Sequence, residues 1–287
     1  MDFFLSYIIL AEIYALLALS TNLLVGVTGI FSVSQAAVFG VGAYTCSILT
    51  TTADVPFGLA ILAAAAVCVV VNVLVALPSL RVSGDYFVVT SFGIQFLCTA
   101  IFENWVGITG GSSGLTGIPA PEVFGFHTEE PTHFVLMSSA ALAIACVCFH
   151  LALHSPFGRL LAAIRQDELA VAAAGQNVLR GKVNAAALAG AFNGVAGGLY
   201  GAFLSFIDPY SFDMQGSILL VSMVVVGGVR TMAGSIVGPL FLIGLPQLLA
   251  FIDIPSSVAG PVRQLTYGVL LVVFMMFRPG GLVGRRL

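Results

Sequence analysis

Amide, hydroxyl and glycine residues interrupt two otherwise apolar segments, and the chemistry that these types offer is hydrogen bonding rather than bond making. Residues 29–50 read GIFSVSQAAVFGVGAYTCSILT, and residues 184–206 read NAAALAGAFNGVAGGLYGAFLSF. Polar groups are costly against lipid, so they should face protein or a water-filled path, while glycine and alanine let helices approach closely. Hydrogen-bonded helix packing is one reading; a polar passage is the other, and we favour it because one bundle would contain both segments. The residues expected along this passage are Ser32, Ser34, Gln35, Gly40, Gly42, Tyr44, Asn193 and Tyr200.

Catalytic and cofactor chemistry is not indicated. The sequence has no GxxxxGK[ST] phosphate-binding loop, and its single lysine, Lys182, is followed by valine. It has no Ser-His-Asp arrangement, its 4 histidines lack a metal-ligand spacing, and its 5 cysteines lie inside apolar runs as small buried hydrophobic residues would. We therefore expect no enzyme activity, no cofactor, no metal site and no nucleic-acid partner.

The elements that must position the polar residues are membrane spans. The 287 residues are 59% hydrophobic and 8% charged, with a mean hydropathy of +1.08, which leaves too little charge to cover the surface of a soluble domain. Apolar runs of about 20 residues predict an all-α polytopic integral membrane protein with about 8–10 helices. We expect one transmembrane domain over residues 1–287. The nine candidate spans are residues 3–24, 30–50, 57–80, 86–104, 134–153, 185–206, 215–229, 233–252 and 259–277.

Basic residues indicate the orientation, because Lys and Arg in short loops stay on the cytoplasmic side. With the N-terminus outside, every basic residue except Arg263 falls on the inner side. The first residues include Asp2 and Glu12 but no cation, which is unlike the start of a cleaved signal peptide. The first apolar run is therefore expected to remain as a span.

Residues 155–183, SPFGRLLAAIRQDELAVAAAGQNVLRGKV, form a polar segment on the predicted cytosolic side, which we call the coupling segment. Ser155 with Pro156 predicts the start of one short helix, and Asp167 predicts a second that stops at Gly175. The second helix has an alanine-rich face that could seat in a groove of a soluble motor; the alternative is an amphipathic connector at the membrane surface. The residues expected at the motor contact are Arg165, Asp167, Glu168, Ala170, Ala172, Ala174 and Gly175.

Residues 105–133 form the longest predicted extracytoplasmic segment, which we call the outer loop. It contains TGGSSGLTGIP at residues 109–119 and no cation. Glycine and serine at this density cannot form a lipid-facing helix and indicate tight turns at the membrane surface. A flexible loop and a docking surface remain the two readings. The candidates for docking are Gly110, Gly111, Ser112, Gly114 and Gly117.

Motifs spread over nearly the whole chain carry a family resemblance. In order they are STNLLVGVTGIFSVSQAAVFGVGAYT, LRVSGDYFVVTSFG, NWVGITGGSSGLTGIP, FGRLLAAIRQDELAVAAAGQNV and MFRPGGLVG. In sequence and spacing they resemble the membrane subunits of branched-chain amino acid ABC importers, the LivH/LivM family, and specifically its LivM type. One departure is Ser34-Gln35, where many relatives have a Gly-His or Gly-Gln pair.

The resemblance implies an ABC importer permease bundle in the bacterial cytoplasmic (inner) membrane. Its partners would be a LivH-type permease, two cytosolic ATPases that contact the coupling segment, and an extracytoplasmic solute-binding protein that docks on the outer side. The solute would be a branched-chain amino acid or, alternatively, urea, a short amide or an aromatic acid, which permeases of the same family import. The residues alone also allow an ion-coupled secondary transporter, but such a carrier needs an ionisable relay in its core and no platform.

Overall fold

The chain is almost entirely helical in the computed structural model, which describes residues 2–80, 85–119, 121–123, 126–127 and 131–249 and scattered positions between 262 and 283. The longer helices are α1 (Asp2–Thr21), α2 (Gln35–Thr52), α3 (Phe57–Ala76), α4 (Asp85–Asn104), α6 (Pro131–His154), α9 (Val178–Leu204), α10 (Met214–Gly227) and α11 (Met232–Leu249). The shorter elements are α5 (Val106–Thr109), α7 (Pro156–Gln166), α8 (Glu168–Ala173), β1 (Leu115–Thr116), β2 (Glu122–Val123), β3 (Phe126–His127) and β4 (Phe206–Ile207). Strand β1 pairs with β4, and β2 pairs with β3, both antiparallel.

Several helices are long and apolar enough to cross a membrane. Among the described residues these are Phe4–Thr28, Phe57–Ala76, Tyr86–Asn104, Thr132–His154 and Val178–Leu204. Met214–Gly227 and Met232–Gly244 are shorter apolar helices. The structure thus confirms a polytopic, all-α membrane protein. The ninth predicted span, residues 259–277, lies largely outside the described residues.

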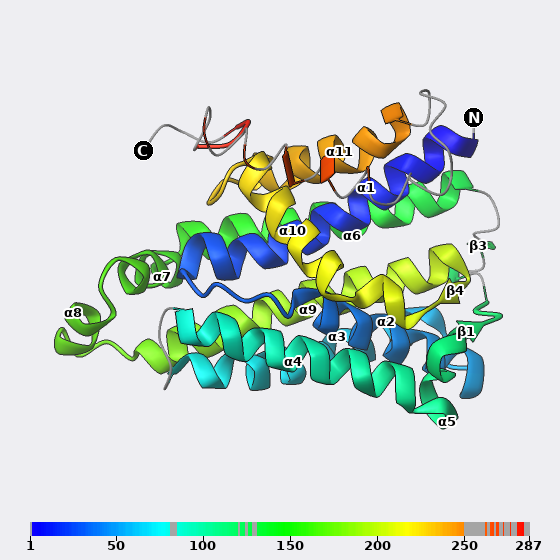
Figure 1. Ribbon diagram of the computed structural model, residues 1–287, viewed down its shortest axis with the longest axis horizontal. Coiled ribbons are helices and arrows are strands. Elements are labelled where there is room, and N and C mark those ends of the chain that lie inside the picture. The colour runs from blue at the N-terminus through cyan, green and yellow to red at the C-terminus, as the bar shows by residue number, and fades with distance from the viewer. Residues whose placement is uncertain are drawn as a thin grey trace.

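The helices form two groups, and α10 crosses between them (Figure 1). One group contains α1, α6 and α11, and the other contains α2, α3, α4 and α9. Helices α7 and α8 project from one end of the bundle, whereas α5 and the strands β1 and β4 lie at the opposite end (Figure 1). The coupling segment and the outer loop therefore occupy opposite ends, as the predicted topology requires.

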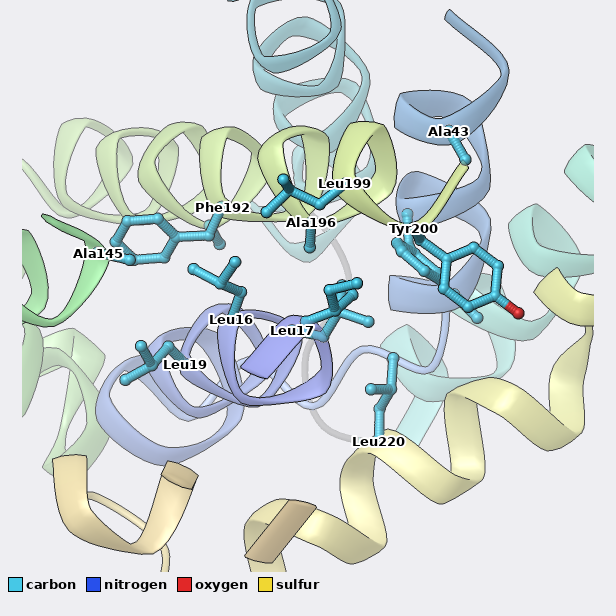
Figure 2. Close-up of a cluster of buried hydrophobic side chains, with 14 of the residues drawn as sticks. Leu16, Leu17, Leu19, Ala43, Ala145, Phe192, Ala196, Leu199, Tyr200 and Leu220 are labelled. Atoms are coloured by element: carbon cyan, nitrogen blue, oxygen red, sulfur yellow. The ribbon is translucent and has the colours of Figure 1, made fainter. Parts of the chain in front are cut away.

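The hydrophobic core lies where α1 meets α9. Figure 2 shows Leu16, Leu17 and Leu19 of α1 in one cluster with Phe192, Ala196 and Leu199 of α9, to which α6 adds Ala145 and α10 adds Leu220. All of these side chains are buried. Helix α1 is therefore an interior helix that holds the two groups together, which explains why its sequence is apolar on every face.

Glycines on α9 bring it into backbone contact with its neighbours. A β-carbon at Gly190 would lie 2.4 Å from the carbonyl oxygen of Cys68 in α3, and one at Gly197 would lie 2.5 Å from the backbone nitrogen of Ala43 in α2. A β-carbon at Gly42 would in turn lie 2.8 Å from the Cα of Gly194. Small residues thus let α2, α3 and α9 pack closely, as they do in other membrane helix pairs.

The chain is not helical where the second predicted span should begin. After α1, residues 22–28 continue as a π-helical turn that ends at Gly29, whose φ of 76° is left-handed. Residues 29–34 carry no helix, and α2 starts only at Gln35. The prediction of a helix from residue 30 is therefore wrong for residues 30–34, because side chains from other helices bind the backbone there, as described below.

We expect Gly194→Ala to destabilise the protein by about 1–3 kcal/mol, the usual cost of overpacking. The new β-carbon would lie 2.5 Å from the Cα of Ala65, and that backbone atom cannot rotate away. The matched control is Gly93→Ala in α4, where no atom lies within 4 Å of the added carbon. Thermal unfolding in detergent should show a lower midpoint for Gly194→Ala only; equal midpoints would contradict the close packing.

Candidate functional site

Three side chains from other helices bind the backbone at the start of α2. Ser91 Oγ accepts a hydrogen bond from the N–H of Val33 at 3.1 Å, Gln95 Oε1 accepts one from Ala37 at 3.1 Å, and Ser217 Oγ accepts one from Ala36 at 3.0 Å. Ser91 and Gln95 lie on α4, and Ser217 lies on α10. The first N–H groups of a helix have no partner within the helix, so these side chains replace the missing turn inside the bundle.

Gln95 joins four parts of the structure. Its Oε1 atom also accepts a hydrogen bond from Ser217 at 3.1 Å, and its Nε2 atom donates to the carbonyl oxygen of Phe212 at 2.7 Å. The side chain is fully buried. Phe212 ends the 3₁₀ turn Pro209–Phe212, and Asp213 then caps the start of α10 by accepting from Gly216 N at 2.9 Å. Helices α2 and α10 therefore both begin beside the middle of α4.

Buried amides form a second polar layer between α2, α3 and α9. Asn193 Nδ2 donates to Gln35 Oε1 at 2.7 Å, and Gln35 Nε2 lies 3.5 Å from Asn72 Oδ1. Asn72 Nδ2 donates to the carbonyl oxygen of Ala186 at 2.8 Å, and Ser20 Oγ of α1 lies 3.4 Å from Gln35 Oε1. The Oδ1 atom of Asn193 is buried and makes no hydrogen bond. We call these residues the amide layer: Ser20, Gln35, Asn72 and Asn193.

The amide layer is closed in this state. Gln35, Asn72 and Ser32 line a crevice together with Leu24, Ile30 and Phe87, and the crevice is too narrow to hold a water molecule. Ser32 Oγ lies 2.9 Å from Ser34 Oγ, so these two hydroxyls also bond within the protein. A solute could reach these groups only if the surrounding helices separated.

An aromatic layer lies beside the amide layer on the side of the outer loop. Its members pack with ring centroids 4.9–6.3 Å apart. A β-carbon at Gly40 would lie 2.8 Å from the rings of Phe102 and Phe212, so glycine is needed for this packing. The aromatic layer consists of Phe39, Tyr44, Phe102, Tyr200 and Phe212.

The structure thus groups most of the predicted passage residues but assigns them to different layers. Gln35 and Asn193 belong to the amide layer, with Ser32 and Ser34 next to it, while Gly40, Tyr44 and Tyr200 belong to the aromatic layer; Gly42 serves helix packing. The sequence reasoning missed five of the buried polar residues, those that bond in the amide layer or at the start of α2 and α10. A search for every amide or serine within an apolar run would have found them: Ser20, Asn72, Ser91, Gln95 and Ser217.

The coupling segment folds as predicted. Ser155 caps α7, and Asp167 caps α8 by accepting from Ala170 N at 3.0 Å. The segment turns at Gly175, whose φ is 77°. Glu168 forms an ion pair with Lys182 at 2.8 Å, which fixes α8 against the start of α9.

Helix α8 presents small apolar residues to its surroundings. Ala170, Ala172, Ala174 and Gly175 are exposed. Leu169 is 82% exposed, the largest value among the large hydrophobic side chains described, yet the sequence reasoning did not single it out. An exposed leucine among alanines is suited to a protein contact.

Arg165 ties α7 to the π-helical turn after α1. Its Nη1 atom donates to the carbonyl oxygen of Gly26. Burial and the charge of Arg230 lower the pKa of Arg165, although a guanidinium remains protonated. Nearby, Asn22 accepts from the N–H of Arg230 at 2.8 Å and donates to Ser235 Oγ at 2.7 Å. The π-helical turn after α1 is therefore hydrogen-bonded to the coupling segment at Gly26 and to the α10–α11 turn at Asn22.

The outer loop is a set of tight turns. Gly110, Gly111, Gly114 and Gly117 all have φ values of 61–75°. Ser112 and Gly117 are exposed, Gly110 and Gly114 are half-buried, and Gly111 is buried. Gly111 therefore shapes the loop and does not form part of its surface in this state. Next to the loop, a surface hollow of about 390 Å³ is lined by Thr50, residues 54–57, Pro119 and Pro121.

The part of the chain that the structure describes contains no group of three or more His, Cys, Asp or Glu residues that could hold a metal ion. Glu12, midway along α1, accepts hydrogen bonds from Ser138 and Ser139 of α6. Its carboxylate thus bonds to a neighbouring helix.

A bundle of apolar helices with buried polar layers and a helical platform at one end defines a polytopic α-helical membrane protein. Comparison with known proteins is more specific: the family model described as "Branched-chain amino acid transport system / permease component" matches residues 3–277. The chain belongs to this family.

Three curated relatives are similar over most of the chain. It is 27% identical to the "High-affinity branched-chain amino acid transport system permease protein LivM" of Salmonella typhimurium, over 94% of this chain and 68% of that protein. The protein of the same name from Escherichia coli is 26% identical, over 96% and 68%. The "Probable branched-chain amino acid transport permease protein LivM" of Methanocaldococcus jannaschii is 27% identical, over 78% and 67%. No solved structure gives a significant match.

We expect Gln95→Leu to destabilise the protein by about 1–3 kcal/mol, although leucine is the more apolar residue, because it leaves buried backbone groups unpaired. The control is Thr90→Val on the same helix, since Thr90 is only half-buried and its hydroxyl donates to the carbonyl oxygen of Tyr86 in its own helix. Thermal unfolding in detergent should show a loss for Gln95→Leu alone. An unfolding midpoint at or above the control would show that Gln95 does not support the start of α2.

Proposed function

We propose that this chain is the transmembrane permease subunit of an ATP-driven importer of branched-chain amino acids in the bacterial cytoplasmic membrane. It works with a LivH-type permease, two cytosolic ATPases and an extracytoplasmic solute-binding protein. The binding protein docks on the outer loop through exposed Ser112 and Gly117, whose turns depend on Gly110, Gly111 and Gly114. The solute then passes along the aromatic and amide layers.

The observation that carries this proposal is the set of bonds that connects the coupling segment, which contains α7 and α8, to the membrane-spanning helices. The chain contains no nucleotide-binding motif, so energy must arrive from a partner. Exposed α8 offers that partner a small apolar surface, and Glu168–Lys182 holds it rigidly. Arg165 and Asn22 then connect the segment to α1 and to the α10–α11 turn. Movement of α8 is therefore passed to the helices that surround the amide layer.

The amide layer suits a small polar solute. Glutamine and asparagine can each donate and accept, so Gln35, Asn72 and Asn193 can match either the ammonium or the carboxylate of an amino acid. Such groups would also accept urea or short amides, and the printed names of the relatives favour branched-chain amino acids. The amide donors could also bind the carboxylate of an aromatic acid, so it is the relatives' names that favour a branched-chain amino acid over that alternative.

An ion-coupled carrier remains the competing class. It requires an ionisable relay along the passage, but Glu12, the carboxylate midway along α1, is bonded to Ser138 and Ser139. To separate the classes, the chain with its partner subunits should be placed in proteoliposomes containing ATP, with loaded binding protein outside. Labelled leucine should enter only when ATP is present, and its uptake should continue when ionophores abolish the ion gradients. Uptake driven by an ion gradient without ATP would overturn the proposal, and competition by urea or benzoate would reassign the solute.

We expect Ala172→Trp and Ala173→Trp to abolish uptake while the subunit still inserts. The indole overfills the groove on the ATPase, at a cost of about 1–3 kcal/mol, and Asp167→Ala should weaken the helix by about 1 kcal/mol. The control is Ala66→Trp, which adds the same bulk to an exposed position on α3. Uptake and membrane abundance are measured together.

A crosslink checks the contact itself. Cysteines replacing Ala170 and Ala174, in a chain whose five native cysteines are removed, should crosslink to cysteines along the ATPase groove. If a cysteine that replaces Ser112 crosslinked to the ATPase instead, the outer loop would lie on the ATPase side and the topology would be reversed.

A further inference from the structure

Two buried layers are stacked along the same two helices. Gln35 and Asn193 bond in the amide layer, while Phe39 and Tyr200 meet edge to face in the aromatic layer, with ring centroids 5.1 Å apart. Because a helix rises about 1.5 Å per residue, the aromatic layer lies roughly 6–10 Å closer to the outer loop. A solute that enters from the outer loop must cross the aromatic rings before it reaches the amides.

Phe212 lies at the centre of the aromatic layer. It is fully buried, and the other four rings have their centroids 5.1–6.3 Å from its own. Those four rings lie on α2, α4 and α9, whereas Phe212 belongs to the 3₁₀ turn Pro209–Phe212. A side chain on a short turn can leave its site without the movement of a whole helix.

The turn that carries Phe212 is attached to the outer loop through the backbone. In the β1–β4 pair, Leu115 faces Ile207 and Thr116 faces Phe206. Gly114 lies so close to β4 that a β-carbon there would be 2.1 Å from the carbonyl oxygen of Ile207. Strand β4 ends five residues before Phe212, so a displacement of β1 must act on the turn.

Tyr44 contributes a buried hydroxyl without a partner. The residue is 3% exposed, and its oxygen makes no hydrogen bond. A buried hydroxyl in this condition is unfavourable and needs an explanation. Its ring contacts Phe212 at a centroid distance of 5.9 Å. Once Phe212 moved, the hydroxyl could bond to an oxygen of a passing solute.

We infer that Phe212 closes the outer end of the solute passage and that the β1–β4 pair transmits docking at the outer loop to it. The inference rests on the proposed transport function. In the closed state the ring fills the space between α2, α4 and α9, and Gln95 holds the turn by its hydrogen bond to the Phe212 carbonyl. Docking shifts β1, the turn follows through β4, and the solute passes between Phe39 and Tyr200.

The first experiment measures uptake by Phe212→Ala without binding protein. The complete assembly is placed in vesicles that contain ATP, with labelled leucine but no binding protein outside. Wild-type vesicles should take up little leucine, whereas Phe212→Ala vesicles should take it up, because the outer end of the passage no longer needs docking to open. The matched control is Phe134→Ala, because Phe134 is also buried near the outer loop but packs against Phe203, outside the aromatic layer. No uptake by Phe212→Ala, or equal uptake by the control, would overturn the inference.

The second experiment tests whether β1 and β4 move as one unit. Thr116→Cys and Phe206→Cys place a disulfide across the β1–β4 pair, in a chain without the five native cysteines. Because the two strands are expected to shift together, oxidation should leave uptake that depends on binding protein unchanged. Single-cysteine variants are the controls. Uptake that is lost on oxidation and recovered with a reductant would show that β1 must separate from β4, which would overturn the transmission through β4.

The two proposals can fail separately. ATP-dependent uptake by the wild-type assembly tests the transport function alone. If that uptake is present but uptake by Phe212→Ala still requires binding protein, only the role of Phe212 is wrong. If wild-type uptake requires an ion gradient, the proposed function itself is wrong.

Discussion

The arrangement of this protein depends on one constraint: a backbone inside a membrane must find all of its hydrogen-bond partners within the protein. Residues 29–34 break the helical path between α1 and α2 and leave the first N–H groups of α2 without helical partners. Ser217 and Gln95 supply partners for Ala36 and Ala37, and Ser91 binds the N–H of Val33 within the break. Helices α4 and α10 therefore lie beside the start of α2 in this structure, and Gln95 also holds the Pro209–Phe212 turn in the bundle.

The size of the side chains at each helix contact determines which parts of the bundle are rigid and which can move. Glycines bring α9 into backbone contact with α2 and α3, and such contacts cannot slide far without collisions. Helix α4 instead meets its neighbours largely through Gln95, Ser91 and the aromatic rings, while Val89, Phe96 and Leu97 on its other faces are exposed. Hydrogen bonds between side chains can exchange partners where packed backbones cannot. Helix α4 and the turn between β4 and α10 are thus better able to move than α9 with α2 and α3, or than α10, whose Gly227 packs against the backbone of Gly234 in α11.

Short sequence patterns, such as helix caps and apolar runs, predicted the features that depend on residues close together in the chain. Ser155, Asp167 and Gly175 act within one turn of their helices, and the spans follow from the composition of single runs. The break at residues 29–34 could not be predicted in this way, because the side chains that stabilise it are 58 and 181 positions away in the sequence. The same holds for the β1–β4 pair. The sequence shows which polar residues lie in apolar runs, but it does not show which of them contact one another in the folded protein.

In the solute passage proposed above, amides have a physical advantage over charged residues. A buried ion pair would bind a charged solute strongly and would be costly to leave unpaired when the solute departed. A neutral hydrogen bond contributes only about 0.5–1.5 kcal/mol net, so Gln35, Asn72 and Asn193 can exchange bonds with each other for bonds with a solute at little cost in either direction. Asn193 keeps one acceptor unpaired even when the layer is closed. A layer built in this way guides a polar solute without retaining it, and selection among solutes must then occur before the solute reaches the layer.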